Sequence, residues 1–280
     1  MKTPKTLYIL ISIFCVFAIV AGIYSQFFEK KANNRNLITG DNKKNTITEE
    51  SLDTIKEKFG QIFTNTINLN GFDDSNISKI NSEKAIVYTA YDVVKNEKSY
   101  EMNIKVPVVN IKNEVGNSFN TLTQSIFVNK ANEIMSSTNQ TSKTIYRLEY
   151  VGYINDNILS VVIRSNLKEG TKAQRVMVQT YNYNLTTGQN VTLDDLIQKK
   201  SLDKNNVEKK IKAVITEADN QSKTIQNAGY SVDFSRDLSS GIYSVEKSTT
   251  FFLGEDEKLC IIYAYGNQNY TSEMDVVLFE

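Results

Sequence analysis

Residues Thr180 to Ile197 read TYNYNLTTGQNVTLDDLI and contain a strand, a tight turn and the start of a helix. Tyr181, Tyr183 and Leu185 alternate with polar neighbours, which is the period of a half-buried strand. Gly188 follows two threonines and predicts a turn in which the backbone takes a positive φ. This stretch therefore predicts a strand that leads directly into a helix.

The helix start has its own signals. Thr192 is a good N-cap residue, and Asp195, three positions later, completes a capping box. Asp194 and Asp195 also place negative charge at the positive end of the helix dipole. Because neighbouring residues on a helix point in different directions, we interpret this acidic pair as helix capping and not as a catalytic carboxylate pair.

The composition limits the classes of function. The chain has 280 residues and 40% hydrophobic content, which is enough for a sizeable core. Its 32 basic and 32 acidic residues cancel, so no nucleic-acid partner is expected. The absence of histidine removes the commonest general base and metal ligand, and we expect no cofactor and no metal. The two cysteines, Cys15 and Cys260, lie in unrelated segments and predict no internal disulfide.

An uncharged segment near the N-terminus, Leu7 to Phe28, is 22 residues long. As a helix it would span roughly 33 Å, enough for the core of a bilayer. We predict that residues 7–28 form a retained transmembrane anchor after a short cytoplasmic tail, residues 1–6. The alternative is a cleaved signal peptide, with a small-residue site at Ala18 to Gly22.

The segments after the anchor predict a linker and a helix. Residues 29–46 are rich in Asn and Lys and predict a flexible linker. Residues 47–74 contain an amphipathic helical pattern, Thr48 to Asn65, followed by a loop. We interpret this helix as one that packs on the domain, and the alternative is a helix on the membrane surface.

More Lys and Arg residues follow the anchor than precede it, which by the positive-inside rule places the domain in the cytoplasm. That rule is weak for long domains.

The remaining chain predicts an α+β fold, with antiparallel sheets and packed helices after one N-terminal transmembrane helix. Pro107 cannot donate to a strand ladder, so its strand is expected to lie at a sheet edge or to end there. Residues 221–247 are expected to be irregular. The expected strands are Lys84–Val94, Lys98–Val109, Thr144–Asn155, Ile158–Ser165, Ala173–Leu185, Ser248–Leu253, Lys258–Tyr265 and Glu273–Phe279, and the expected helices are Glu114–Met135 and Asp203–Asn220.

The central motif resembles a known family. YNYNLTTGQNVTLDDLI resembles the signature of the DUF3298 domain, and the C-terminal TFFLGEDEKLCIIYAYGNQNYTSEMDVVLF resembles its closing strands. YEMNIKVPVVN and the helix after it resemble the DUF4163 domain that usually precedes DUF3298. The resemblance covers roughly residues 75–280 and implies a DUF4163-like half at 75–170 and a DUF3298-like half at 171–280.

The combined region is similar to the extracytoplasmic part of RsiV-type anti-sigma factors and to the N-terminal module of PdaC-type peptidoglycan deacetylases. This resemblance favours an extracytoplasmic domain at the cell membrane, against the charge count. Six residues before the anchor leave no room for a sigma-binding segment, so no sigma-factor partner is expected. The chain also lacks the histidines that a metal-dependent deacetylase domain needs.

Three functions follow as hypotheses. The first is a non-catalytic binding or sensing module, anchored in the membrane, for a cell-envelope ligand such as a cell-wall glycan or a lysozyme-like protein. The second is a hydrolase whose site uses only Asp, Glu, Ser, Lys or Tyr. The third is an interaction subunit of a membrane complex.

The predicted ligand-binding residues are Tyr263, Tyr265, Asn267 and Tyr270. Tyr263 and Tyr265 lie two apart in a predicted strand and share a face, with Tyr270 across the following turn. Aromatic rings beside an amide side chain are able to stack on sugars or to anchor a protein partner. The alternative is that Tyr263 and Tyr265 point into the core.

Overall fold

The computed structural model describes residues 50–280 apart from 69–71, 138–141 and 233. These residues form an α+β fold, as the sequence predicts. The predicted tail, anchor and linker lie outside the described residues. Within the described ranges, none of the helices is long and apolar enough to cross a membrane.

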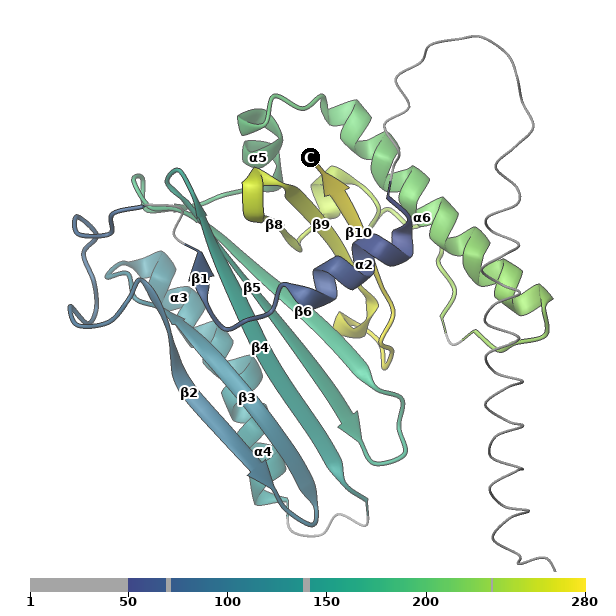
Figure 1. Ribbon diagram of the computed structural model, residues 1–280, viewed down its shortest axis with the longest axis horizontal. Coiled ribbons are helices and arrows are strands. Elements are labelled where there is room, and N and C mark those ends of the chain that lie inside the picture. The colour runs from purple at the N-terminus through teal and green to yellow at the C-terminus, as the bar shows by residue number, and fades with distance from the viewer. Residues whose placement is uncertain (1–49, 69–71, 138–141, 233) are drawn as a thin grey trace, which may run out of the picture. The chain divides into compact units, whose positions relative to one another are not determined.

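Most strands belong to one large sheet (Figure 1). Its strands follow the order β2-β3-β4-β5-β6-β7, and β1 pairs with β4 outside this row, which makes seven strands in the described part of the chain. The strands are β1 (Ile67–Asn68), β2 (Val87–Asn96), β3 (Tyr100–Val109), β4 (Thr144–Asn155), β5 (Ile158–Glu169), β6 (Arg175–Asn184) and β7 (Gln189–Asn190). The predicted meander is confirmed, because β4, β5 and β6 pair antiparallel over long stretches.

The expectation of antiparallel sheets is wrong for the large sheet, which is mixed, because β1 and β3 both pair in parallel with β4. A helical segment connects β3 to β4, as a parallel pair requires. It consists of α3 (Glu114–Thr123), a π-helical turn (Gln124–Val128) and α4 (Asn129–Ser136). Asn113 caps its start, because the Asn113 side chain accepts a hydrogen bond from the backbone N–H of Gly116 at 2.8 Å. Phe119, Phe127, Ala131 and Ile134 lie in the same buried cluster as residues of β3, β4 and β5. The segment therefore covers one face of the large sheet.

A smaller sheet with the order β10-β9-β8 packs on the opposite face of the large sheet. Its strands are β8 (Phe251–Leu253), β9 (Leu259–Ala264) and β10 (Met274–Phe279). The contact includes Val162 and Val178 of the large sheet and Ile262 and Val276 of the small one. Helix α2 (Leu52–Gln61) adds Phe59 to this core. The predicted amphipathic helix therefore packs on the domain.

The second face of the small sheet packs against α6 (Lys204–Asn227) and α5 (Leu193–Lys199). Val207, Ile211 and Ile215 of α6 share a buried cluster with Ile261 and Val277 of the small sheet. The domain consequently has four layers: α3 and α4, the large sheet, the small sheet, and α6 (Figure 1).

The central motif folds as its sequence predicts. Tyr183 lies in β6, and Gly188 adopts a φ of 72° in the turn before β7. The Thr192 N–H donates to Asp195 Oδ2 at 2.7 Å, and the Asp195 N–H donates to Thr192 Oγ1 at 3.2 Å. The capping box is confirmed. Asp194 forms an ion pair with Lys204 at 3.0 Å, at the start of the next helix.

The edge position expected for Pro107 is wrong for β3 as a whole but right at Pro107 itself, where β3 pairs only with β2. Its strand β3 lies between β2 and β4. Pairing with β4 ends at Ile104, however, and pairing with β2 shifts register between Thr89 and Tyr91, beside Pro107. Proline is tolerated where a ladder is interrupted, because its missing N–H breaks no regular bond there.

The irregular segment expected at 221–247 is also partly wrong. Helix α6 continues through Asn227, seven residues beyond its expected end at Asn220. Its last turns contain Ser222 and Thr224, whose side chains donate hydrogen bonds to carbonyls four residues earlier, and they carry no apolar stripe. The apolar periodicity stops before the helix does, which explains the missed end.

Candidate functional site

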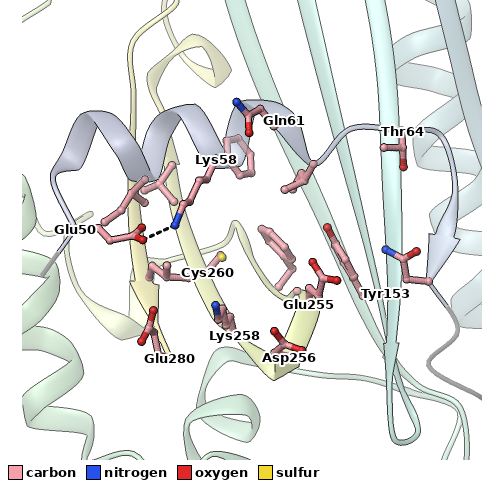
Figure 2. Close-up of a pocket in the computed structure, with 18 of the residues that line it drawn as sticks. Glu50, Lys58, Gln61, Thr64, Tyr153, Glu255, Asp256, Lys258, Cys260 and Glu280 are labelled. Atoms are coloured by element: carbon pink, nitrogen blue, oxygen red, sulfur yellow. Dashed lines mark hydrogen bonds and ion pairs between the residues drawn. The ribbon is translucent and has the colours of Figure 1, made fainter. Parts of the chain in front are cut away.

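A cleft lies between α2 and the small sheet (Figure 2). Its volume is about 550 Å³, and α2, β1, β4 and the three strands of the small sheet all contribute to its walls. Gly152 in β4 leaves room for the Ile67 side chain of β1, whose Cδ1 would lie 2.1 Å from a Cβ at this position. The cleft brings together segments from both ends of the described chain.

Aromatic rings form the floor of the cleft. Phe252 of β8 stacks on Tyr153 of β4, with ring centroids 6.0 Å apart, and Phe59 of α2 lies 6.3 Å from Phe252. Ile55 and Ile62 lie on the same helix face as Phe59 and line the wall above the rings. These three rings are each 4% exposed or less, so the apolar contact open to a ligand comes mainly from the partly buried Ile55 and Ile62.

Charged side chains of both signs surround the opening. On α2, Lys58 forms an ion pair with Glu50. Glu255, Asp256 and Lys258 lie opposite them, on the turn between β8 and β9 (Figure 2). The rim therefore provides partners for both anionic and cationic groups of a ligand.

Two chemically reactive groups line the cleft, and both are held neutral. Burial raises the pKa of the Cys260 thiol to about 12. Burial also raises the pKa of the Tyr153 phenol to about 12, with smaller contributions from Cys260 and Glu255. The thiolate is the nucleophilic form of cysteine, so a thiol that stays protonated at neutral pH is unreactive. This chemistry suits hydrogen bonding more than nucleophilic attack.

The described residues contain no group of three or more Cys, Asp or Glu side chains arranged to hold a metal ion. The four carboxylates around the cleft, Glu50, Glu255, Asp256 and Glu280, do not form such a cluster. The expectation that the protein uses no metal and no cofactor stays a prediction.

Two of the predicted ligand-binding residues lie in the core. Tyr263 and Tyr265 do share a face of the small sheet, but that face is covered by α6. Each residue is only 7% exposed. The Tyr263 hydroxyl is 2.8 Å from Ser248 Oγ, and Phe234 stacks on Tyr265 with a centroid distance of 4.1 Å. The expected exposed surface is therefore wrong for these two residues, because the sequence period gave the face but not its cover.

Tyr265 belongs to a buried polar network centred on Asp275 of β10. The Tyr265 hydroxyl donates to Asp275 Oδ2 at 2.6 Å, and Arg236 donates to both carboxylate oxygens at 2.6 and 2.8 Å. Lys56 of α2 lies 3.2 Å from Asp275 Oδ1. Burial raises the pKa of Asp275, but the hydrogen bonds from Arg236 and Tyr265 outweigh it and hold the pKa below its usual value. The network ties α2 and the loop after α6 to β10.

Asn267 has a structural role at the edge of β6. The Val178 N–H donates to Asn267 Oδ1 at 3.1 Å, and Asn267 Nδ2 donates to the Val178 carbonyl at 3.0 Å. Gly266 lies so close to β6 that a Cβ would be 1.8 Å from the Val176 carbonyl oxygen. The amide side chain thus replaces a neighbouring strand and covers an otherwise open sheet edge.

Tyr270 is the predicted contact residue that is exposed, at 51%. Its hydroxyl donates to Glu169 Oε2 at 3.3 Å. Lys172 Nζ and Arg175 Cζ lie 5.3 and 5.5 Å from the centre of its ring. Tyr270 therefore lies on a different surface from the cleft, with cationic neighbours.

Sequence reasoning did not find the cleft. The amphipathic pattern of α2 carried part of the signal, since it placed Ile55, Phe59 and Ile62 on one face. Phe252 and Cys260 alternate out of phase with the tyrosines of the same sheet, a pattern that by itself indicates only strand residues. Their meeting with α2 depends on tertiary packing.

Comparisons with known proteins find structural neighbours only. No protein-family profile matches the sequence, and no curated protein matches it. A DUF3298 family protein from Pseudomonas aeruginosa has a similar structure, at 10% identity over 60% of this chain and 75% of that chain, with a TM-score of 0.34. A DUF3298 family member from Bacteroides fragilis is similar at 15% identity over 59% and 74%, with a TM-score of 0.31.

Proposed function

We propose that the protein is a membrane-anchored, extracytoplasmic and non-catalytic binding or sensing module, and that its cleft binds a fragment of the cell wall. The cleft carries the proposal. Its volume of about 550 Å³ lies within the usual range for small-ligand sites, roughly 300–1,000 Å³. A protein partner such as a lysozyme needs a face of about 800 Å² on each side.

The chemistry of the cleft supports a glycopeptide ligand. Ile55 and Ile62, which are only partly buried on the wall of the cleft, offer an apolar surface to a sugar. Lys258 lies beside Glu255 and Asp256 on the rim, so carboxylate and ammonium groups of a short wall peptide both find partners. The neutral Cys260 thiol favours binding over cleavage.

Binding is tested with the full-length protein in an uncharged detergent and wall fragments released by a muramidase. Lys258→Glu should weaken binding about tenfold, or ~1.4 kcal/mol, because it removes the cationic partner on the rim. The matched control is Lys209→Glu, which makes the same charge change at an exposed position on α6. Isothermal titration calorimetry measures both. If both variants bind like the parent protein, the cleft is not the site.

The same samples separate the alternatives. Cleavage of the wall fragments, detected by mass spectrometry, would favour the hydrolase. Binding of intact lysozyme that is insensitive to Lys258→Glu would favour a protein partner on another surface. Co-purification of a stoichiometric membrane protein from cells would favour the interaction subunit.

The topology proposed for residues 7–28 is tested separately. Protease added to intact cells should digest the domain and leave a short membrane-embedded fragment. If the domain survives until the cells are lysed, the positive-inside count is right and the outward orientation is wrong.

A further inference from the structure

One end of the large sheet is strongly cationic. Three parts of the sheet lie at this end: the turn between β2 and β3, the start of β4, and the turn between β5 and β6 (Figure 1). We define the cationic end by its charged side chains in the described part of the chain, which are Lys95, Lys98, Lys130, Lys143, Arg147, Lys168, Lys172, Arg175, Glu97, Glu101, Glu133 and Glu169. Eight cations and four carboxylates give a net charge of +4, in a chain whose net charge is zero.

Direct contacts show that these side chains are neighbours. Lys143 Nζ donates to Asn96 Oδ1 at 2.7 Å in the β2–β3 turn, and the Lys143 carbonyl accepts from the Gly170 N–H at 3.2 Å in the β5–β6 turn. Glu169 lies 3.0 Å from Lys130 Nζ and 3.8 Å from Lys172 Nζ. Three turns that are distant in sequence thus form one surface.

Several of these cations are not neutralised. Lys98, Lys168 and Arg175 have no carboxylate partner among the described residues, and Lys168 Nζ donates instead to the Lys172 carbonyl at 3.2 Å. Lys172 is 61% exposed at its side chain although it pairs with Glu169. Uncompensated cations on one surface attract polyanions and release their counterions on binding.

The exposed ring of Tyr270 adds a second kind of contact at the same place. Lys172 and Arg175 lie over this ring, and Glu169 accepts from its hydroxyl, so the ring is held at the margin of the cationic end. Arg175 is itself fixed, because it donates to the carbonyls of Gly266 and Asn267. A half-exposed aromatic ring beside cations suits a sugar linked to a phosphate.

We infer that the cationic end binds a linear polymer that carries phosphate groups alternating with sugar or polyol units. From β3 across β4 and β5 to β6, three strand spacings place the cations in a row of about 14 Å. A row matches successive charges of an extended chain. Tyr153 of the cleft is nine residues along β4 from Thr144 at this end, or about 30 Å away, so the two sites are independent.

The experiment uses the full-length protein in uncharged detergent and long-chain polyphosphate as the probe, followed by fluorescence anisotropy at several salt concentrations. Lys143→Glu with Lys172→Glu should weaken binding at least tenfold and lower the slope of log K against log salt by about 1 to 2. Glu169→Gln should tighten binding, because it removes the central negative charge. The matched control, Lys209→Glu with Lys212→Glu on α6, should bind like the parent protein.

Each of the following three outcomes would overturn the inference. Equal weakening by the α6 control would mean that only total charge matters. Equal affinity for polyglutamate of the same length would mean that phosphate is not recognised. Displacement of polyphosphate by phosphatidylglycerol added to the micelles would assign the surface to lipid headgroups. Unfolding is excluded by melting temperatures within about 2 °C of the parent, and wall-fragment binding in the cleft should be unchanged in the Lys143 and Lys172 variant.

Discussion

The two faces of the small sheet are held in different ways. The face toward the large sheet is apolar, and Phe252, Ile262 and Val276 pack there against strand residues. The face toward α6 contains the buried pair Arg236 and Asp275, with Tyr265 hydrogen-bonded to the same carboxylate. When an apolar side chain on the first face is shortened, only part of its buried surface is lost, and the free energy of unfolding falls by a modest amount. A buried ion pair that loses one partner leaves a charge without compensation, so the second face should be far more sensitive to substitution.

The largest effect is expected for Asp275→Ala. It leaves the buried Arg236 guanidinium with only the partly exposed Glu273 carboxylate, 3.6 Å away, and should lower the free energy of unfolding by about 3 kcal/mol. Ile262→Val on the apolar face is the comparison and should cost about 1 kcal/mol. Chemical denaturation of both variants checks the difference. The double variant Arg236→Met with Asp275→Leu should recover most of the loss, and failure to recover it would mean that the pair does more than compensate its own charges.

Tyr265→Ala should cost about 3 kcal/mol, by analogy with buried phenylalanine, because the ring stacks on Phe234 and the hydroxyl bonds to Asp275. Tyr265→Phe keeps the ring and should cost about 1.5 kcal/mol, which is the share of a hydrogen bond to a charged group. Thermal unfolding of the two variants separates the contribution of the ring from the contribution of the hydroxyl. A loss below about 1 kcal/mol for Tyr265→Ala would contradict its placement in the core.

The third prediction concerns acid. The pKa of Asp275 is lowered in the folded state, so the unfolded state binds a proton first as the pH falls. Stability from this group is complete above its unfolded pKa of about 3.9 and is lost as the pH falls through the folded value. Denaturation between pH 6 and 3 should therefore show a steeper acid loss in the parent than in Asp275→Asn. Equal slopes would mean that Arg236, Tyr265 and Lys56 do not hold the carboxylate ionised.

Thr192→Ala should cost about 1 kcal/mol, the usual loss for a removed N-cap. The effect is smaller than those in the core, because Thr192 is exposed and its capping box stabilises only the start of α5. Thr186→Ala makes the same substitution in the turn before β7, where Thr186 caps no helix, and should lower the free energy of unfolding less than Thr192→Ala does. A change in ligand affinity with no change in unfolding would instead make Thr192 part of a site.

The smallest effect is expected for Tyr270→Ala, within about 0.5 kcal/mol in stability. Its ring is half exposed, in contrast to the buried ring of Tyr265 five residues earlier. Binding of polyphosphate should also change little, because the ring is assigned to the sugar unit and polyphosphate has none. A stability loss comparable to that of Tyr265→Ala would show that exposure alone does not separate these two tyrosines.

The sequence predicted the elements of the fold well where its period was clear. β4, β5 and β6 follow the predicted meander, and Asp156 adopts a φ of 52° in the predicted turn between β4 and β5. The sequence was less informative about which side chains are exposed where both faces of a strand are buried. Tyr263 and Cys260 alternate correctly on β9, but both sides of that strand are buried, one by α6 and one by the large sheet and α2.

The boundary expected between the two halves, at residues 170 and 171, stays a prediction. In the structure it falls between β5 and β6, which pair over ten residues from Ile158 to Leu167. The large sheet is therefore continuous across this position, and the halves named by the resemblance share one sheet.

The amino-acid sequence by itself determined the local structure: the capping box at Thr192, the alternation of the strands, the helix expected at Glu114–Met135 and the α+β order. These depend on contacts between residues close in the chain, which sequence spacing records directly. Only the tertiary structure decided which faces are covered, that Asp275 meets Arg236, and that α2 and the small sheet enclose a cleft. Those contacts join residues that are 39 or more positions apart in the chain. Burial and charge pairing at such separations depend on how the layers stack. The local periodicity of the sequence does not specify that stacking.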